Sequence, residues 1–151
     1  MKINWINSIF AGLIGTVLFD LSGWALTSQL WDIPALLGEK LGLGMAGGLL
    51  AHYGNGIAIA IIYAGLAPSL FGPRWFRALS FVTAQTVLGV WLFMLPLLGA
   101  GVAGVNLNPL LPVITLLRHF AFAIPLIFLS VNASATFAKE GFLLGKGTQR
   151  T

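Results

Sequence analysis

Two histidines carry the clearest chemical signal in the sequence, because each interrupts an otherwise apolar stretch. His52 lies in LAHYGNGIAIA and His119 lies in LRHFAFAIPLI. A pair of imidazoles can ligate a haem iron, or can exchange protons with a nearby carboxylate. Asp20 is the one carboxylate inside the long apolar segments, and Arg118 directly precedes the second histidine. The chain has no cysteine, so disulfides, thiolate metal sites and cysteine nucleophiles are excluded.

The composition places these residues in a membrane protein. Of 151 residues, 58% are hydrophobic and 8% are charged, whereas soluble domains have about 25% charged residues. The net charge is +4, but the basic residues form no continuous stripe, so nucleic acid is not an expected partner. The expected partners are the lipid bilayer and either other membrane subunits or further copies of the chain in a homo-oligomer.

Four segments are long and apolar enough to cross a bilayer, which takes about 20 residues. They cover about 6–27, 44–66, 76–98 and 109–131. Between the first two, Asp32 is a plausible N-cap for a short interfacial helix over about 33–41. The sequence therefore predicts an all-α fold, an integral membrane four-helix bundle that forms one domain over residues 1–151, with a cytoplasmic tail over 132–151.

The basic residues also predict an orientation. Those expected on one side are Lys2, Arg74, Arg77, Lys139, Lys146 and Arg150, and the other side carries only Lys40. Because positive loops stay in the cytoplasm, we expect a multi-pass protein of the cell (cytoplasmic) membrane with both termini inside.

A weak internal repeat relates the two halves of the chain. At an offset of 67 residues, His52 aligns with His119 and Leu50 with Leu117. Each half contains two spans, so the repeat predicts two tandem transmembrane hairpins related by an axis along the membrane normal.

Small residues predict which faces of these helices pack together. Counting by four along the second span gives Gly44, Gly48, His52, Gly56, Ala60 and Ala64. Such stripes let membrane helices approach closely, so His52 is expected to face another helix. The first span repeats the pattern with Ser8, Gly12, Thr16 and Asp20, and the fourth with Thr115, His119 and Ala123.

The polar residues on these faces are expected to share one layer of the membrane. At about 1.5 Å per residue, they lie about 10–15 Å below the outer ends of their helices: Asp20, His52, Arg118 and His119. Asp20 and Arg118 are expected to form a buried pair, since neither has another opposite charge within its span. Gln85 and Thr86 lie somewhat deeper and are expected to line the same cavity.

Three functional hypotheses follow from this layer. In the first, a redox-associated subunit holds haem b, with His52 and His119 as ligands of the metal, space for the porphyrin beside Gly56, and Arg118 meeting a propionate. In the second, the layer is only hydrogen-bonded packing in a cofactor-free accessory or assembly subunit of a membrane complex. In the third, Asp20 and the histidines relay protons in a small transporter.

The sequence also resembles a known kind of protein. The stretches GLIGTVLFD, WDIPALLG and LAHYGNGIAIAIIYA are similar to small prokaryotic four-span membrane proteins, known as families of unknown function. The resemblance covers mainly the first half of the chain and implies the four-span fold without an activity or catalytic residues. No motif of a soluble enzyme occurs, with GxSxG, HExxH and P-loop patterns all absent, so whether the protein is an enzyme stays open.

Overall fold

The structure is a computed structural model that describes residues 3–129. Over this range the chain is helical and contains no strand. The predicted tail over 132–151 and the last residues of the predicted fourth span lie outside the described residues.

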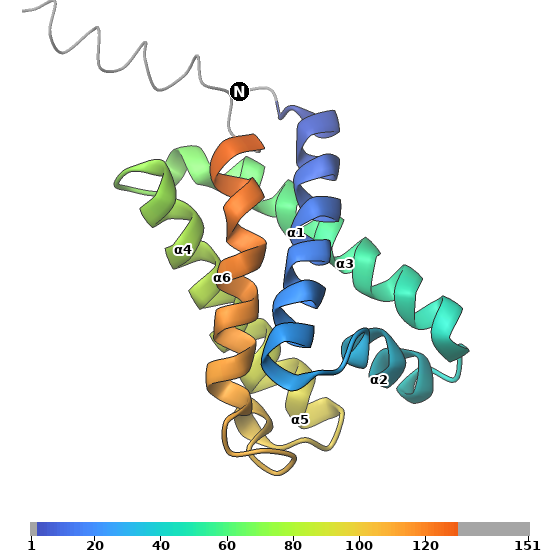
Figure 1. The fold of residues 1–151 in the computed structure, drawn as a ribbon. Helices are drawn as coiled ribbons and strands as arrows, with labels where there is room; N and C mark the ends of the chain where they lie inside the picture. Colours follow the sequence, from blue (N-terminus) through green and yellow to red (C-terminus); the bar gives the residue numbers. More distant parts are fainter. Residues whose placement is uncertain (1–2, 130–151) are drawn as a thin grey trace, which may run out of the picture.

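The helices are arranged as four long segments with short helices between them (Figure 1). Three long segments are single helices: α1 (Trp5–Thr27), α3 (Gly44–Leu66) and α6 (Leu111–Leu129). The other consists of α4 (Arg74–Gln85), the π-helix η2 (Thr86–Met94) and α5 (Leu95–Leu97). The short connecting helices are α2 (Asp32–Lys40), η1 (Ala67–Ser69) and η3 (Val102–Gly104).

The four predicted spans are confirmed as helices of sufficient length and hydropathy to cross a membrane. Their bounds are Trp5–Thr27, Gly44–Ser69, Arg74–Leu97 and Leu111–Leu129, close to the predicted ones. The all-helical membrane bundle therefore follows from the sequence. The internal repeat and the orientation of the termini stay predictions.

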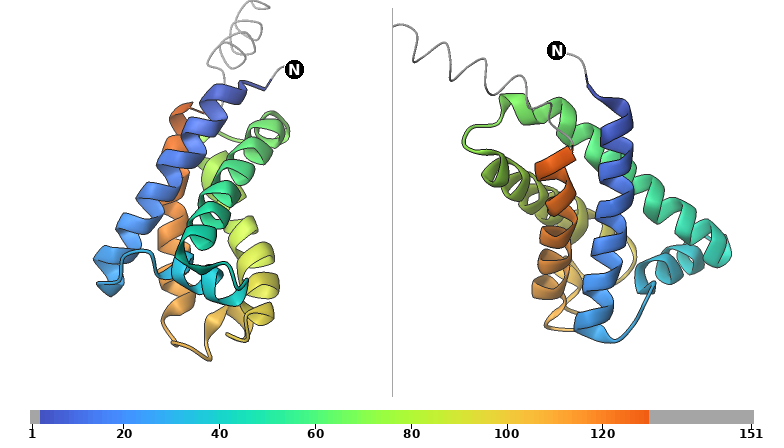
Figure 2. Two further views of the ribbon diagram at one scale, coloured as in Figure 1. Left: turned by 90° about the vertical axis from the view of Figure 1, so that its right-hand side faces the viewer. Right: turned by 45° about the horizontal axis from the view of Figure 1, so that its top comes forward.

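Helices α1 and α6 lie side by side in the middle of the bundle (Figures 1 and 2). Helix α3 packs against α1 and α4 packs against α6. By contrast, α3 and α4 share few backbone contacts, and the rings of Tyr63 and Phe81 pack between them with centroids 5.2 Å apart. The helices thus form a curved row rather than a closed ring.

Glycine allows the close approach of α1 and α3. A Cβ atom on Gly12 would lie 2.6 Å from the Cα atom of Ile57, and one on Gly56 would collide with the hydroxyl of Thr16. The predicted small-residue faces of both helices are buried, except for Gly44 at the exposed start of α3. The stripes identified in the sequence therefore do mark the packing faces.

Helix α2 is predicted correctly, with one change at its start. Trp31 occupies the N-cap position with a left-handed backbone (φ 60°), and Asp32 is the first helical residue. The helix packs on the beginning of α3, where a Cβ atom on Gly48 would collide with the carbonyl of Pro34. This packing turns Asp32 back toward the bundle.

The π-helix in the third span is not predicted by the sequence. Its wider turns, with hydrogen bonds from each residue to the fifth residue along the chain, begin directly after Gln85. Within it the indole N–H of Trp91 donates to the hydroxyl of Thr115 at 2.9 Å, which ties the π-helix to α6. Segments of this kind occur frequently at functional sites.

Candidate functional site

Asp20 lies at the centre of a buried polar cluster. Its side chain, 3% exposed, accepts a hydrogen bond from Nε2 of His52 at 3.0 Å and one from the hydroxyl of Tyr53 at 3.2 Å. Nη2 of Arg118 lies 3.8 Å from the same carboxylate. Helix α1 supplies the acceptor, α3 two donors and α6 the cation, so the cluster links three spans.

The closest partner of Arg118 is Asp32 rather than the predicted Asp20. Nη1 of Arg118 donates to Oδ2 of Asp32 at 2.7 Å, and Nη2 donates to Oδ1 at 2.8 Å. This parallel pair of bonds is the strongest geometry open to arginine and a carboxylate. The predicted pair with Asp20 exists only as the longer contact. The prediction restricted the partner to residues within a span, whereas α2 returns an acid from the connecting segment.

The fold makes room for the buried guanidinium of Arg118. A Cβ atom on Gly23 would overlap it, so α1 can pass only because this residue lacks a side chain. On the other side the Cζ atom of Arg118 lies 4.2 Å from the ring centroid of Phe19, a favourable cation–π distance. Burial of the arginine is therefore matched by two carboxylates and an aromatic face.

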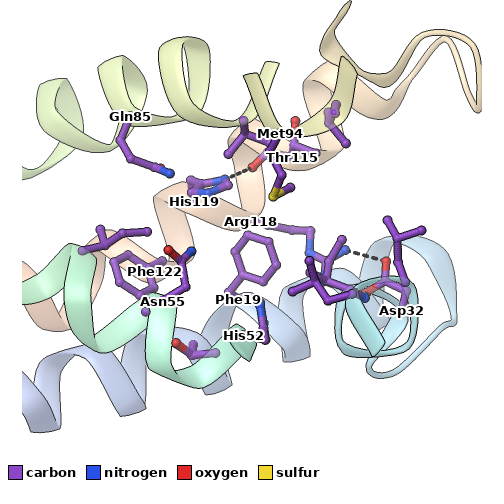
Figure 3. A pocket seen from close by; sticks show the side chains of 18 of the residues that line it. Phe19, Asp32, His52, Asn55, Gln85, Met94, Thr115, Arg118, His119 and Phe122 are labelled. Carbon is purple, nitrogen blue, oxygen red and sulfur yellow. Dashed lines mark hydrogen bonds and ion pairs between the residues drawn. The ribbon is translucent and has the colours of Figure 1, made fainter. Parts of the chain in front are cut away.

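The two histidines flank the ring of Phe19. The ring centroid of Phe19 is 5.4 Å from that of His52 and 4.9 Å from that of His119, and Figure 3 shows the phenyl ring between the imidazoles. Their hydrogen bonds also differ, because His52 pairs with Asp20 while Nδ1 of His119 lies 2.7 Å from the carbonyl oxygen of Thr115.

This arrangement does not fit a haem held by both histidines. A shared iron needs the two imidazoles to face each other across the porphyrin, and here Phe19 lies between them. Nε2 of His52 is engaged with Asp20. Haem ligation by His52 and His119 stays a prediction that the described geometry does not favour.

A cavity of about 220 Å³, which we call the central cavity, lies beside the cluster. It is neither sealed nor a shallow surface groove, and residues from α1, α2, α3, α6, the third span and the loop before α6 line it. Most of its wall is apolar. The polar lining residues are Thr16, Asp32, His52, Asn55, Gln85, Thr115, Arg118 and His119.

Three of the predicted residues take distinct positions at this cavity. Gln85 lines it, as predicted, and its side chain extends toward His119 (Figure 3). Thr86 does not line it, because its buried hydroxyl donates to the carbonyl of Val82 at 2.7 Å. Gly56 lies on the wall and also provides the close contact with α1.

Several polar atoms at the cavity have no partner within the described part of the chain. They include the buried Oε1 of Gln85 and the buried Nε of Arg118. Asn55 also lines the cavity from α3, but it is an exposed residue. Buried polar atoms are nearly always paired, so the unpaired atoms of Gln85 and Arg118 mark lining residues beside which a ligand or water could be accommodated.

Sequence reasoning missed four residues of the site. Asp32 was identified only as a helix start, and Tyr53, Phe19 and Asn55 were not singled out. The signal for Tyr53 and Asn55 is their position in LAHYGNG, one and three residues after His52. No charge-balance signal marks Asp32, because Asp20 already balances Arg118 within the spans and Asp32 lies in the connecting segment.

The chain matches no protein-family model, no curated protein and no solved structure in comparisons with known proteins. The site combines a charge-paired cluster with an adjoining cavity whose wall is mostly apolar.

Proposed function

We propose that this chain binds a small, mainly apolar molecule within the membrane, in the central cavity, and needs no cofactor to do so. The observation that carries the proposal is the cavity itself: about 220 Å³ of space with mainly apolar walls and a few polar side chains, two of which, Gln85 and Arg118, each have a buried atom without a partner among residues 3–129. Binding sites for small molecules have this composition, with a few placed polar groups on an apolar surface.

The size of the cavity limits the ligand. An engineered apolar cavity of about 150 Å³ takes up benzene, and pockets for drug-sized molecules start at about 300 Å³. At about 220 Å³, the central cavity has room for one ring with a few substituents. A larger molecule would have to leave part of its length outside.

The cavity supports entry from the lipid between α3 and the π-helix η2. Both elements line it, they share little contact with each other, and the outer surfaces of the spans carry many exposed large apolar side chains, as expected for helices in hydrocarbon. A ligand dissolved in the bilayer would reach the cavity between α3 and η2 without crossing water. This route suits a lipid-phase carrier or the ligand-binding subunit of a membrane complex.

Saturable binding of a fluorinated alkylbenzene tests the proposal. The protein is reconstituted in lipid nanodiscs, 1-fluoro-4-pentylbenzene is added, and its fluorine NMR signal is compared with that in empty nanodiscs. We expect saturable binding that Val90→Phe abolishes, because Val90 lies on the cavity wall. Val87→Phe is the matched control on the same π-helix, since Val87 lies outside the central cavity.

Two results would contradict the proposal. One is the absence of saturable binding to the wild-type protein, and the other is binding that Val90→Phe and Val87→Phe leave equally intact. The second would place the ligand elsewhere on the protein.

The haem hypothesis has its own test. A reduced-minus-oxidised spectrum of protein expressed with haem precursor would contain a b-type signal, lost in His52→Ala and His119→Ala, if the chain were a cytochrome. We expect a flat spectrum. A haem signal that depends on both histidines would overturn the cofactor-free proposal.

A further inference from the structure

The free polar atom of His119 at the central cavity is an acceptor. Nδ1 lies 2.7 Å from the carbonyl oxygen of Thr115, and a carbonyl can only accept, so Nδ1 carries the hydrogen. In a neutral imidazole the lone pair then lies on Nε2. No residue in the described range hydrogen-bonds to Nε2, and His119 pairs with no carboxylate there.

A second acceptor lies on the neighbouring wall. Oε1 of Gln85 is buried without a partner among residues 3–129. The amide nitrogen of Gln85 is the atom nearest His119 in Figure 3, and a half-turn of the amide, which exchanges its two polar atoms, would present Oε1 to a ligand beside His119. Leaving a buried acceptor unpaired is unfavourable. A ligand hydroxyl placed between these two side chains would pair with one or both.

The charges around the cavity favour a neutral donor over an ion. An anion would be repelled by the lone pairs of His119 and Gln85 and by the carboxylate of Asp32. The cation Arg118 would not compensate, because it is already paired with that carboxylate. A cation would approach Arg118, which adjoins His119 in the chain. A hydroxyl group satisfies the acceptors and adds no charge.

Aromatic side chains on the wall favour a planar ring. Phe19 and Phe122 both line the cavity, and the ring of Phe19 meets His119 edge to face at 81°. Aromatic rings gain from edge-to-face and offset contacts beyond the area they bury, and the volume admits one ring.

We propose that the ligand is a lipid-soluble phenol or hydroquinone whose ring hydroxyl donates to Nε2 of His119, with Gln85 as second acceptor. This inference rests on the proposed function and names the ligand class of the same cavity. The ring lies against Phe19, and an alkyl tail leaves the cavity between α3 and η2 into the lipid.

Competition against the fluorinated alkylbenzene in nanodiscs tests this chemistry. The probes are 4-pentylphenol, its methyl ether, pentylbenzene and pentylhydroquinone, each compared at equal concentration in the bilayer. The ether keeps the ring and the oxygen but cannot donate. We expect the phenol to bind about tenfold more tightly than the ether or pentylbenzene, the factor for one net hydrogen bond.

Variants then identify the protein atom that accepts the hydrogen bond from the ligand hydroxyl. His119→Phe should remove the preference for the phenol while keeping the affinity for pentylbenzene, and Gln85→Leu should reduce it. Tyr63→Phe is the control, because it also removes one buried polar group but lies away from the cavity. Hydroquinone binding that exceeds phenol binding assigns the ligand to hydroquinones, and equal binding assigns it to monophenols.

The outcomes separate this inference from the proposed function. Equal binding of phenol, ether and pentylbenzene, unchanged by His119→Phe, would overturn the donor assignment and leave the cavity as a binding site. No saturable binding of any probe would overturn both. If His119→Phe does not fold, the wild-type preference for phenol over ether, together with Gln85→Leu, decides the inference.

Discussion

Arg118 and Asp32 form two parallel hydrogen bonds of 2.7 and 2.8 Å although they are 86 residues apart in the chain. The side chain of Arg118 is 1% exposed and that of Asp32 is 22% exposed. The pair therefore fixes the connecting helix α2 to the last described span at the edge of the buried region.

Removing the side chain of Asp32 should leave the buried Arg118 without its closest carboxylate. We expect Asp32→Ala to lower the free energy of unfolding by about 3 kcal/mol or more, because breaking a buried pair leaves an uncompensated charge. The double variant Asp32→Ala/Arg118→Leu should recover most of the loss. Unfolding in mixed detergent micelles measures both, and a double variant no more stable than Asp32→Ala would argue against the pairing.

Asp20 and His52 should be energetically coupled. In a double-mutant cycle of Asp20→Leu and His52→Leu, we expect a coupling free energy of about 1–3 kcal/mol, because each single variant removes the buried hydrogen bond between them. Additive effects would contradict the 3.0 Å hydrogen bond between them. Tyr53→Phe should cost about 1 kcal/mol or less, since its bond to Asp20 is longer, at 3.2 Å.

Glycines on different faces should tolerate alanine differently. Gly12→Ala should destabilise the protein by about 1–3 kcal/mol, because the new Cβ atom would lie 2.6 Å from the Cα atom of Ile57. Gly54→Ala is the matched control, since nothing lies within 4 Å of its Cβ position, and should stabilise α3 by up to about 1 kcal/mol. Thermal unfolding followed by circular dichroism compares them; equal losses would refute the α1–α3 crossing.

Removal of the Tyr63 hydroxyl should not destabilise the protein. The side chain is fully buried, and its hydroxyl has no partner among residues 3–129. Because an unpaired buried polar group is unfavourable, Tyr63→Phe should leave stability unchanged or raise it by up to about 1 kcal/mol. A loss above about 2 kcal/mol, seen in detergent unfolding, would mean that the hydroxyl does have a partner.

Hydropathy and helical spacing were sufficient to predict the fold. Long apolar runs specify the spans, and the period of four in small residues identifies the buried faces of α1, α3 and α6, because both depend on local sequence alone. The same spacing brought Asp20, His52, Arg118 and His119 to one layer, where the first three make direct contact.

The partners within that layer could not be read from spacing. Arg118 pairs with Asp32 because α2 folds back against α3. The position of α2 depends on the close backbone contact at Gly48, which the spacing of residues does not reveal. The place of Phe19 between the histidines depends on the rotation of α1. The π-helix after Gln85 likewise has no simple sequence signal.

The pairing of Asp32 with Arg118 also limits how early the native contacts of α2 can form during protein synthesis. Ribosomes add about 5–20 residues per second, so Arg118, 86 residues after Asp32, is made roughly 4 to 17 s later. His52 reaches Asp20 sooner, since only 32 residues separate them. During synthesis the first two spans can form their hairpin early, but the carboxylate on α2 has to wait for the arrival of α6 before its charge is neutralised.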